Sequence, residues 1–461
     1  MTIRGVNLGG WLVLERYITP SLFALTTCSV SKSPTSPCLP LLPYPVDQWT
    51  LASSFPDSET YEDYMSDHWS TFVTEDDIVS IASSNLTHVR VPVGHWIMGS
   101  VSPSEPYFPS ASEWSNFVRV ARLCRAHGLE VWIDLHTAPG SQNGFDNSGR
   151  ALPVPTGLGW SSSPDNVDRT VRAVADIARG IKEAGLSDVV TGFGVLNEPF
   201  KGENAGVVKD FDDRAFEAVR DILPPTTAVY IGDMFNASSF QGFWNDEAHA
   251  HTYLDSHYYH VFASAPRGFS PRQHIAYVCE RNARDLAGCC WSSPSSRSGA
   301  PSPGMGRIMG EWSASFDTLV CAKLDDVMAA KADTGRFAEE DRTIPEDRKK
   351  FLRNFAEAQM VAYEGGPSSG WFYWNFKMEG GAFAEWDYLR GVREGWIPVL
   401  PKDRSALDLF GTCESIIFRT DDDESIVHEF PDPEAVAPDW QAVTPDDDVV
   451  VSHGQSLLRA Q

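Results

Sequence analysis

Short runs of apolar and β-branched residues recur along the chain, separated by longer stretches whose apolar residues follow a helical period. Runs of this kind are typical of strands in a parallel sheet that is buried on both faces. We predict eight strands, at Ile3–Leu8, His88–Val93, Glu130–Leu135, Gly192–Leu196, Ala228–Gly232, Tyr253–His257, Arg307–Gly310 and Gly370–Phe376. Amphipathic helices are predicted between several of them, including Ser112–His127, Val167–Ala184, Asp210–Ile222 and Arg348–Tyr363.

The alternation of eight strands with helices predicts an α/β fold, a closed (β/α)8 TIM barrel rather than an open sheet. No G-x-G-x-x-G motif follows a predicted strand, which argues against a dinucleotide-binding fold. The 461 residues exceed the usual length of one domain, but a single barrel with long loops accommodates them. We therefore expect one catalytic domain over residues 1–415.

Three segments interrupt the barrel pattern. Residues 26–45 contain five prolines and two cysteines, and residues 292–304 are rich in Ser, Pro and Gly, so both are predicted to be irregular surface loops. Residues 416–461 are predicted to form an acidic, largely disordered tail, because residues 421–461 contain eleven Asp or Glu against one Arg.

The composition narrows the choice of partners. A net charge of −26 argues against binding to nucleic acid or to an anionic membrane. No run of eighteen apolar residues is present, so we expect no transmembrane helix. We also expect the protein to be a monomer. The 15 tryptophans fit either a large core or platforms on which sugar rings stack.

The eight cysteines show no paired C-x2-C spacing of a zinc site. Cys279, Cys289 or Cys290, Cys321 and Cys413 would pair in an oxidising compartment, and buried thiols are the alternative. The first residues, Met1–Asn7, lack a charged leader followed by an apolar stretch. We therefore expect a cytoplasmic protein, with a secreted protein whose leader has been removed as the alternative.

Polar and aromatic residues gather where the predicted strands end, which is where a barrel of this kind carries its chemistry. They are Arg90, Asp134, His136, Asn197, Glu198, His257, Tyr259, Glu311 and Trp374. Taken singly, each of these residues is more readily explained by a surface loop position, by core packing or by a structural ion pair than by catalysis. Their joint placement at successive strand ends is what favours an active site.

Two of these residues, Glu198 and Glu311, follow the fourth and seventh strands and would face each other across the barrel mouth. A retaining glycosidase needs two carboxyl groups about 5 Å apart, one attacking the anomeric carbon and one protonating the leaving oxygen. Their proximity raises one pKa, which keeps the acid protonated while its partner stays ionised. This chemistry requires no cofactor and no metal.

The neighbouring residues suggest which carboxylate does what. Arg90 would keep Glu311 ionised and oriented, and Tyr259 would donate a hydrogen bond to it. Asn197 would hold the sugar 2-hydroxyl, and His257 would contact the acid/base or the substrate. We therefore predict that Glu311 is the nucleophile and that Glu198 is the general acid/base.

Several motifs resemble the fungal exo-β-1,3-glucanase (glucan 1,3-β-glucosidase) branch of glycoside hydrolase family 5. The N-terminal motif Arg4–Glu15, with Ile18–Phe23 after it, is similar to that branch in particular. The other matching motifs are Asp134–His136, Gly140–Gly149, Asn197–Pro199, Asp255–Tyr259, Gly310–Ser313 and Trp371–Trp374. The resemblance spans roughly residues 3–415.

The resemblance implies a set of site residues and an activity. Arg90, His136, Asn197, Glu198, His257, Tyr259, Glu311 and Trp374 fall on the active-site pattern of the family. Glu15, Phe145, Asp146 and Asn147 would line the sugar pocket, and Phe262 would form an aromatic entrance clamp with Phe145. The implied activity is that of a retaining exo-acting β-glucosidase. It would remove β-1,3-linked glucose from the non-reducing ends of glucans or oligosaccharides by double displacement.

The chain also departs from that branch. The proline-rich insertion follows the pocket-lining N-terminal motif, and Phe376 stands where the branch often has a tryptophan. The missing leader and the acidic tail resemble the intracellular members. A β-glucosidase for a hydrophobic glucoside of a lipid, sterol or small molecule is therefore the alternative. A non-catalytic carbohydrate-binding protein is disfavoured by the retained glutamates, and a metal hydrolase by the dispersed histidines.

Overall fold

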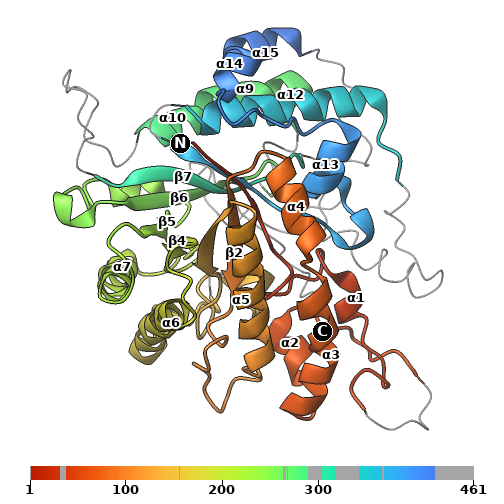
Figure 1. The fold of residues 1–461 in the computed structure, drawn as a ribbon, viewed down its shortest axis with the longest axis vertical. Helices are drawn as coiled ribbons and strands as arrows, with labels where there is room; N and C mark the ends of the chain where they lie inside the picture. Colours follow the sequence, from red (N-terminus) through yellow and green to blue (C-terminus); the bar gives the residue numbers. More distant parts are fainter. Residues whose placement is uncertain are drawn as a thin grey trace.

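The computed structural model describes residues 2–31, 38–154, 156–262, 266, 268–288, 304–316, 342–365 and 368–420. Eight parallel strands close into one barrel in the order of the sequence, which confirms the predicted TIM barrel. The strands are β1 Ile3–Asn7, β2 His88–Val93, β3 Glu130–Leu135, β4 Val190–Gly194, β5 Ala228–Gly232, β6 Thr252–Tyr258, β7 Gly306–Trp312 and β8 Ser368–Tyr373. Figure 1 shows them in the centre of the molecule, with helices around them.

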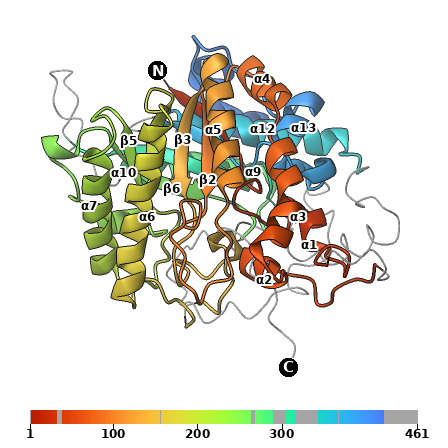
Figure 2. The ribbon, with the colours of Figure 1, turned by 60° about the horizontal axis from the view of Figure 1, so that its bottom comes forward.

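The helices that the structure describes include the four that the sequence predicts. They are α1 Pro20–Phe23, α2 Gln48–Ser53, α3 Ser58–Thr71, α4 Glu75–Ser83, α5 Ala111–Ala126, α6 Pro164–Glu183, α7 Ala205–Arg220, α9 Pro271–Tyr277, α10 Ala283–Gly288, α12 Glu346–Tyr363, α13 Tyr388–Glu394, α14 Ala406–Phe410 and α15 Cys413–Arg419. In Figure 2, α5, α6 and α7 stand beside one another along the barrel wall, and long loops gather at one of its ends.

Some helices begin earlier than their apolar pattern indicates. Helix α6 starts at Pro164 rather than Val167, because the Ser163 side chain caps its first turn and proline suits the first helical position. Helix α7 likewise starts at Ala205 rather than Asp210, since the Asn204 side chain accepts hydrogen bonds from two backbone amides of the first turn.

The strand register brings residues from different strands to one level. Asn7 pairs with Arg90 across β1 and β2, and His257 pairs with Glu311 across β6 and β7. Strand β8 ends at Tyr373 rather than Phe376, because the chain turns inward and the Asn375 side chain hydrogen-bonds to the backbone of Gly9. The register therefore places two pairs of polar residues at matching heights on neighbouring strands.

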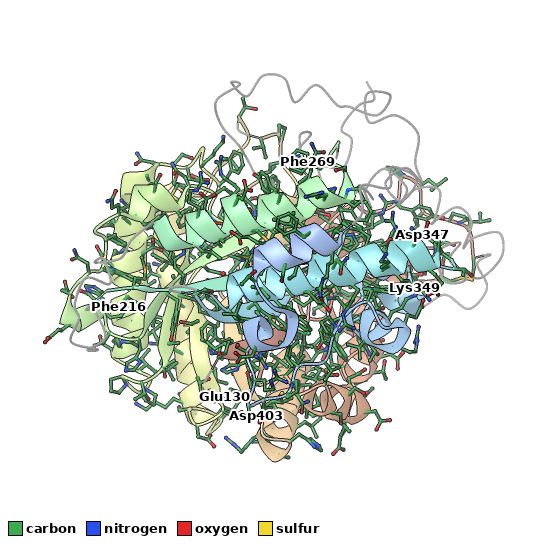
Figure 3. All side chains as sticks on the ribbon, turned by 90° about the horizontal axis from the view of Figure 1, so that it is seen from above. Glu130, Phe216, Phe269, Asp347, Lys349 and Asp403 are labelled. Carbon is green, nitrogen blue, oxygen red and sulfur yellow. A yellow bond between two sulfur atoms is a disulfide. The ribbon has the colours of Figure 1, made fainter. Side chains whose placement is uncertain are left out.

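One side of the barrel is covered by α9, α12 and α15, which contact one another. Figure 3 views the molecule from this side, and its labels for Asp347 and Lys349 mark the N-terminal part of α12. Helix α15 runs past the predicted domain boundary at residue 415 and buries Ile416. Of the predicted loop at 292–304 and the predicted tail at 416–461, residues 292–303 and 421–461 lie outside the described residues. Among the helices that the structure describes, none combines the length and apolar character of a membrane span.

The described part of the chain contains two disulfides. Cys279–Cys413, two of the residues predicted as partners in an oxidising compartment, joins the segment after α9 to α15. Cys28–Cys38, which the sequence did not suggest, closes the proline-rich insertion. Cys124 is a buried free thiol, and Cys289, Cys290 and Cys321 lie outside the described residues.

Replacing Cys279 and Cys413 together by serine is expected to lower the free energy of unfolding by about 2–5 kcal/mol, because the bond closes a long loop in the unfolded chain. The two cysteines are 134 residues apart, against 10 for Cys28 and Cys38. Urea denaturation should therefore show a larger loss for the first pair than for the double serine variant of the second. Equal midpoints for the wild type and the Cys279/Cys413 variant would contradict the expectation.

Candidate active site

Arg90 of β2 is the fully buried centre of the polar network at the barrel mouth. Its Nη1 atom donates to Glu311 Oε1 and to Asn7 Oδ1, each at 2.9 Å. Its Nη2 atom donates to Asn197 Oδ1 at 2.8 Å and lies 3.0 Å from Asp134 Oδ1. Burial alone would lower the pKa of Arg90, but these carboxylates raise it well above its usual value. The guanidinium is thus a permanent cation that orients residues from four strands.

Glu311 on β7 is also fully buried. Besides the bond from Arg90 to its Oε1 atom, its Oε2 atom accepts a hydrogen bond from the Tyr259 hydroxyl at 2.9 Å. Burial raises the pKa of Glu311 and so does the nearby Glu198, while His257 and Arg90 lower it. Donors on both oxygens fix the carboxylate in one orientation, which suits a nucleophile.

Glu198 lies just beyond the end of β4, at a positive φ of 46°. Its Oε1 atom is 2.6 Å from His257 Nδ1, and its Oε2 atom accepts a hydrogen bond from Asn147 Nδ2 at 2.9 Å. The turn is held from below by Gln142, whose Nε2 atom donates to the Asn197 carbonyl at 2.9 Å. A left-handed backbone at a non-glycine residue is strained, and such strain is typical of functional positions.

The two glutamates are close enough for one kind of glycoside hydrolysis. Glu198, His257 and Glu311 each offer a polar atom, and these three atoms lie within 4.8 Å of one another. Carboxyl groups about 5 Å apart leave no room for an attacking water between them and the sugar, which is the geometry of a retaining enzyme. A metal ion fits poorly here, because His257 Nδ1 already lies 2.6 Å from Glu198 and 3.4 Å from Glu311, and the Arg90 guanidinium is 2.9 Å from Glu311.

His257 joins the acid side of the site to a second carboxylate. Its Nδ1 atom faces Glu198, and its Nε2 atom is 3.2 Å from Asp255 Oδ2. Burial opposes a charge on the ring, but Glu311 and Asp255 raise the pKa of His257 well above its usual value. With an acceptor at each nitrogen, the ring is an imidazolium that donates to both. A proton is therefore held at hydrogen-bond distance from Glu198.

The buried rings of Trp374 and His136 stack on each other. Their rings are nearly parallel, at an interplanar angle of 8° and with centroids 5.6 Å apart. The Trp374 indole donates to the Tyr17 hydroxyl at 2.6 Å, and His136 Nδ1 is 2.6 Å from Asp134 Oδ2. Both rings are thus locked by polar partners before any ligand binds.

Glu15 and Asp146 are further buried carboxyl groups of this mouth. Burial, and then Asp146 and Glu311, raise the pKa of Glu15 well above its usual value. Burial, and then Asp47, raise the pKa of Asp146 to about 7. Mutual repulsion among these groups links them to the catalytic pair, and carboxyl groups in such surroundings readily accept or donate hydrogen bonds to sugar hydroxyls.

The structure places the two predicted clamp residues on different neighbours. Phe145 is buried and packs edge-on against Phe200, with ring centroids 5.7 Å apart. Phe262 is half-buried and packs edge-on against Tyr259 at 5.4 Å. Of the two, Phe262 is the one that reaches the shell of Glu311 through its contact with Tyr259.

Several residues of the network were not singled out from the sequence: Asn7, Tyr17, Gln142, Asp255 and Trp386. Asp134 was placed at a strand end without a role, and both aspartates carry a signal in the sequence. Each precedes its histidine by two residues at the end of a strand, as Asp134 with His136 and Asp255 with His257. Residues i and i+2 of a strand point to one face, so an Asp-x-His end predicts the ion pair.

The glycine at position 310 fits this arrangement because its amide donates to Asp255 Oδ1 at 2.7 Å. A Cβ atom there would lie only 2.2 Å from the same oxygen. A side chain at Gly310 would therefore displace the aspartate that faces His257.

Comparison with known proteins identifies the family. A family model described as Cellulase (glycosyl hydrolase family 5) matches residues 54–287. A probable glucan 1,3-β-glucosidase A from Aspergillus clavatus is 34% identical over 420 residues, covering 87% of this chain and 88% of its own. A glucan 1,3-β-glucosidase from Blumeria graminis is 32% identical over 424 residues, covering 90% of this chain and 91% of its own.

Among solved structures, rutinosidase from Aspergillus niger is similar in fold, with a TM-score of 0.61 and 17% identity, covering 86% of this chain and 97% of its own. That likeness bears on the fold alone. The sequence relatives cover 87% and 90% of this chain, and their names match the resemblance seen in the motifs. The chain belongs to glycoside hydrolase family 5 and is a glycosidase.

Proposed function

We propose that the protein is a retaining exo-acting β-glucosidase that removes β-1,3-linked glucose from the non-reducing ends of glucans or oligosaccharides. The observation that carries the proposal is the asymmetry of the close carboxylate pair. Glu311 accepts bonds from Arg90 and Tyr259, whereas Glu198 faces His257 and Asn147. The relatives named glucan 1,3-β-glucosidase support the choice of glucose and of the linkage.

The proposed reaction proceeds by double displacement. Glu311 attacks the anomeric carbon while Glu198 protonates the glycosidic oxygen, so the bond to the leaving sugar breaks and a covalent glucosyl-enzyme forms. Glu198 then removes a proton from a water molecule, which attacks the same carbon and releases glucose with retained configuration. Arg90 and Tyr259 stabilise the carboxylate as it leaves again.

We further propose that the enzyme works in an oxidising compartment. The disulfides Cys28–Cys38 and Cys279–Cys413 support this, because such bonds persist in secreted proteins and are rare in the cytosol. This favours the secreted alternative over the cytoplasmic expectation.

The test compares substrates that differ in linkage and in aglycone. Laminarin, laminaritriose, cellotriose and an alkyl β-glucoside are offered to the wild type, and products are followed by chromatography and by NMR of the anomeric proton. We expect laminaritriose to give glucose and laminaribiose first, with β-glucose preceding its mutarotation, and cellotriose to react at least about tenfold more slowly. Faster turnover of the alkyl glucoside than of laminaritriose would instead support the hydrophobic-aglycone alternative. Internal cleavage of laminarin without early glucose would contradict exo action.

A further inference from the structure

Trp386 is a buried tryptophan in the loop that follows β8, within the 3-10 turn Ala384–Trp386. Its indole packs against the rings of two tyrosines, with centroids 5.9 Å from Tyr17 and 5.3 Å from Tyr259. These tyrosines come from the loop after β1 and from the end of β6. One indole thus makes contact with two parts of the barrel mouth that are far apart in the sequence.

The two tyrosines hydrogen-bond to different residues of the candidate active site. The Tyr259 hydroxyl donates to Glu311 Oε2 at 2.9 Å. The Tyr17 hydroxyl accepts from the Trp374 indole at 2.6 Å and hydrogen-bonds to the Glu15 carboxyl group. Because a hydroxyl is placed by the packing of the ring that carries it, the position of both hydrogen bonds depends on Trp386.

Trp386 is itself held firmly from the preceding residue. The buried Glu385 carboxylate accepts two hydrogen bonds from Arg342, at 3.0 and 3.1 Å, and one from Arg348 at 2.8 Å. Burial opposes this charge, but the Arg348 and Arg342 guanidiniums lower the pKa of Glu385 to about 2. The Trp386 carbonyl also accepts from the Asn375 amide at 2.8 Å. The Glu385 carboxylate therefore stays ionised throughout the pH range in which a glycosidase works.

We propose that Trp386 is a positioning residue for the glycosidase reaction, fixing Tyr259 against the nucleophile and Tyr17 against Trp374. The proposal rests on the proposed function in taking Glu311 as nucleophile, and on the contact with the sugar that the sequence predicts for Trp374. Loosening of Tyr259 weakens a donor to the ionised carboxylate, so Glu311 holds its proton to higher pH. Loosening of Tyr17 frees Trp374 and weakens sugar binding.

The test uses Trp386→Leu and Trp386→Phe with an aryl β-glucoside as substrate. For the leucine variant we expect kcat/KM to fall about 100-fold, with a lower kcat and a higher KM, because small displacements of a catalytic group have effects of this size. The acid limb of the kcat/KM profile should move to higher pH. The phenylalanine variant keeps an aromatic ring between the tyrosines, and it should show a smaller loss of about tenfold and a smaller shift.

Trp69→Leu serves as the matched control, since Trp69 is equally buried and packs on Tyr61, on helix α3 outside the site. Both leucine variants should lose thermal stability. When rates are normalised to the amount of folded protein, only Trp386→Leu should shift the acid limb of the pH profile of kcat/KM. Wild-type kcat/KM and an unmoved limb in Trp386→Leu would overturn the proposal. If that variant does not fold, the same result in Trp386→Phe overturns it. An inactive wild type would count against the proposed function instead.

Discussion

Replacing Glu311 with alanine is expected to reduce kcat for an aryl β-glucoside about 10,000-fold, or roughly 5 kcal/mol of transition-state stabilisation, because no covalent glucosyl-enzyme forms without the carboxylate. Adding sodium azide should restore turnover. The small anion fits the space left by the side chain and attacks the anomeric carbon from the face that Glu311 occupied, which gives α-glucosyl azide. Chromatography of the product and the coupling of its anomeric proton identify this compound.

Glu113→Gln is the control for this experiment. Glu113 is also a buried carboxyl group, but it lies on α5, and burial raises its pKa to about 8, so the neutral amide is a close mimic of its protonated form. Its kcat should equal that of the wild type. Undiminished hydrolysis by Glu311→Ala would refute the nucleophile, and recovery of β-glucosyl azide from it would exchange the roles of the two glutamates.

Replacing Glu198 with alanine should give a loss that depends on the leaving group. For laminaribiose, whose leaving sugar needs a proton, kcat/KM is expected to fall about 100- to 10,000-fold. A dinitrophenyl glucoside has a leaving group that departs without protonation, so the rate constant of its glycosylation step should fall by far less. The alkaline limb of the wild-type profile, which reports loss of the proton from the acid, should disappear from the variant.

Azide distinguishes this variant from the first. In Glu198→Ala the covalent intermediate still forms, so azide attacks it from the opposite face and β-glucosyl azide results. Rates for a series of aryl glucosides measure the dependence on the leaving group. An equal loss for all of them would contradict a role in protonation and would point to a role in sugar binding.

The fold was predictable because its signal is local and repeated. Each strand of the barrel is an apolar run that can be recognised alone, and eight of them leave few arrangements. Helix starts were less predictable, since α6 and α7 begin at the caps Ser163 and Asn204, ahead of the apolar face. The tight turn after β8 depends on Asn375 meeting Gly9, a contact between the two ends of the barrel sequence that no local pattern contains.

In the candidate site, too, the residues with a local sequence signal were predictable, and those placed by contacts between distant segments were not. Glu198 and Glu311 could be proposed because strand ends converge in a barrel. The role of Asn7 could not be predicted, because it lies within a buried strand and its side chain joins the network only through the hydrogen bond that it accepts from Arg90 of the next strand. Tyr17 and Trp386 are distant in sequence, and their pairing is a product of packing. The pKa directions of Glu15 and Asp146 likewise depend on burial, which the sequence does not specify.

The Arg90 network also bears on how such an enzyme can change during evolution or in directed evolution. The guanidinium hydrogen-bonds to Asn7, Asn197 and Glu311, and so links residues at the ends of different strands in one buried network. Removing one partner of such a buried charged network is strongly destabilising, so variation there is expected to lower stability more than it alters selectivity. The proline-rich insertion at residues 26–45, in contrast, contains neither a carboxylate nor an arginine. Libraries aimed at new aglycones should therefore diversify that insertion and leave the network, including Gln142, Asp146 and Asn147 of the 140–149 loop, untouched.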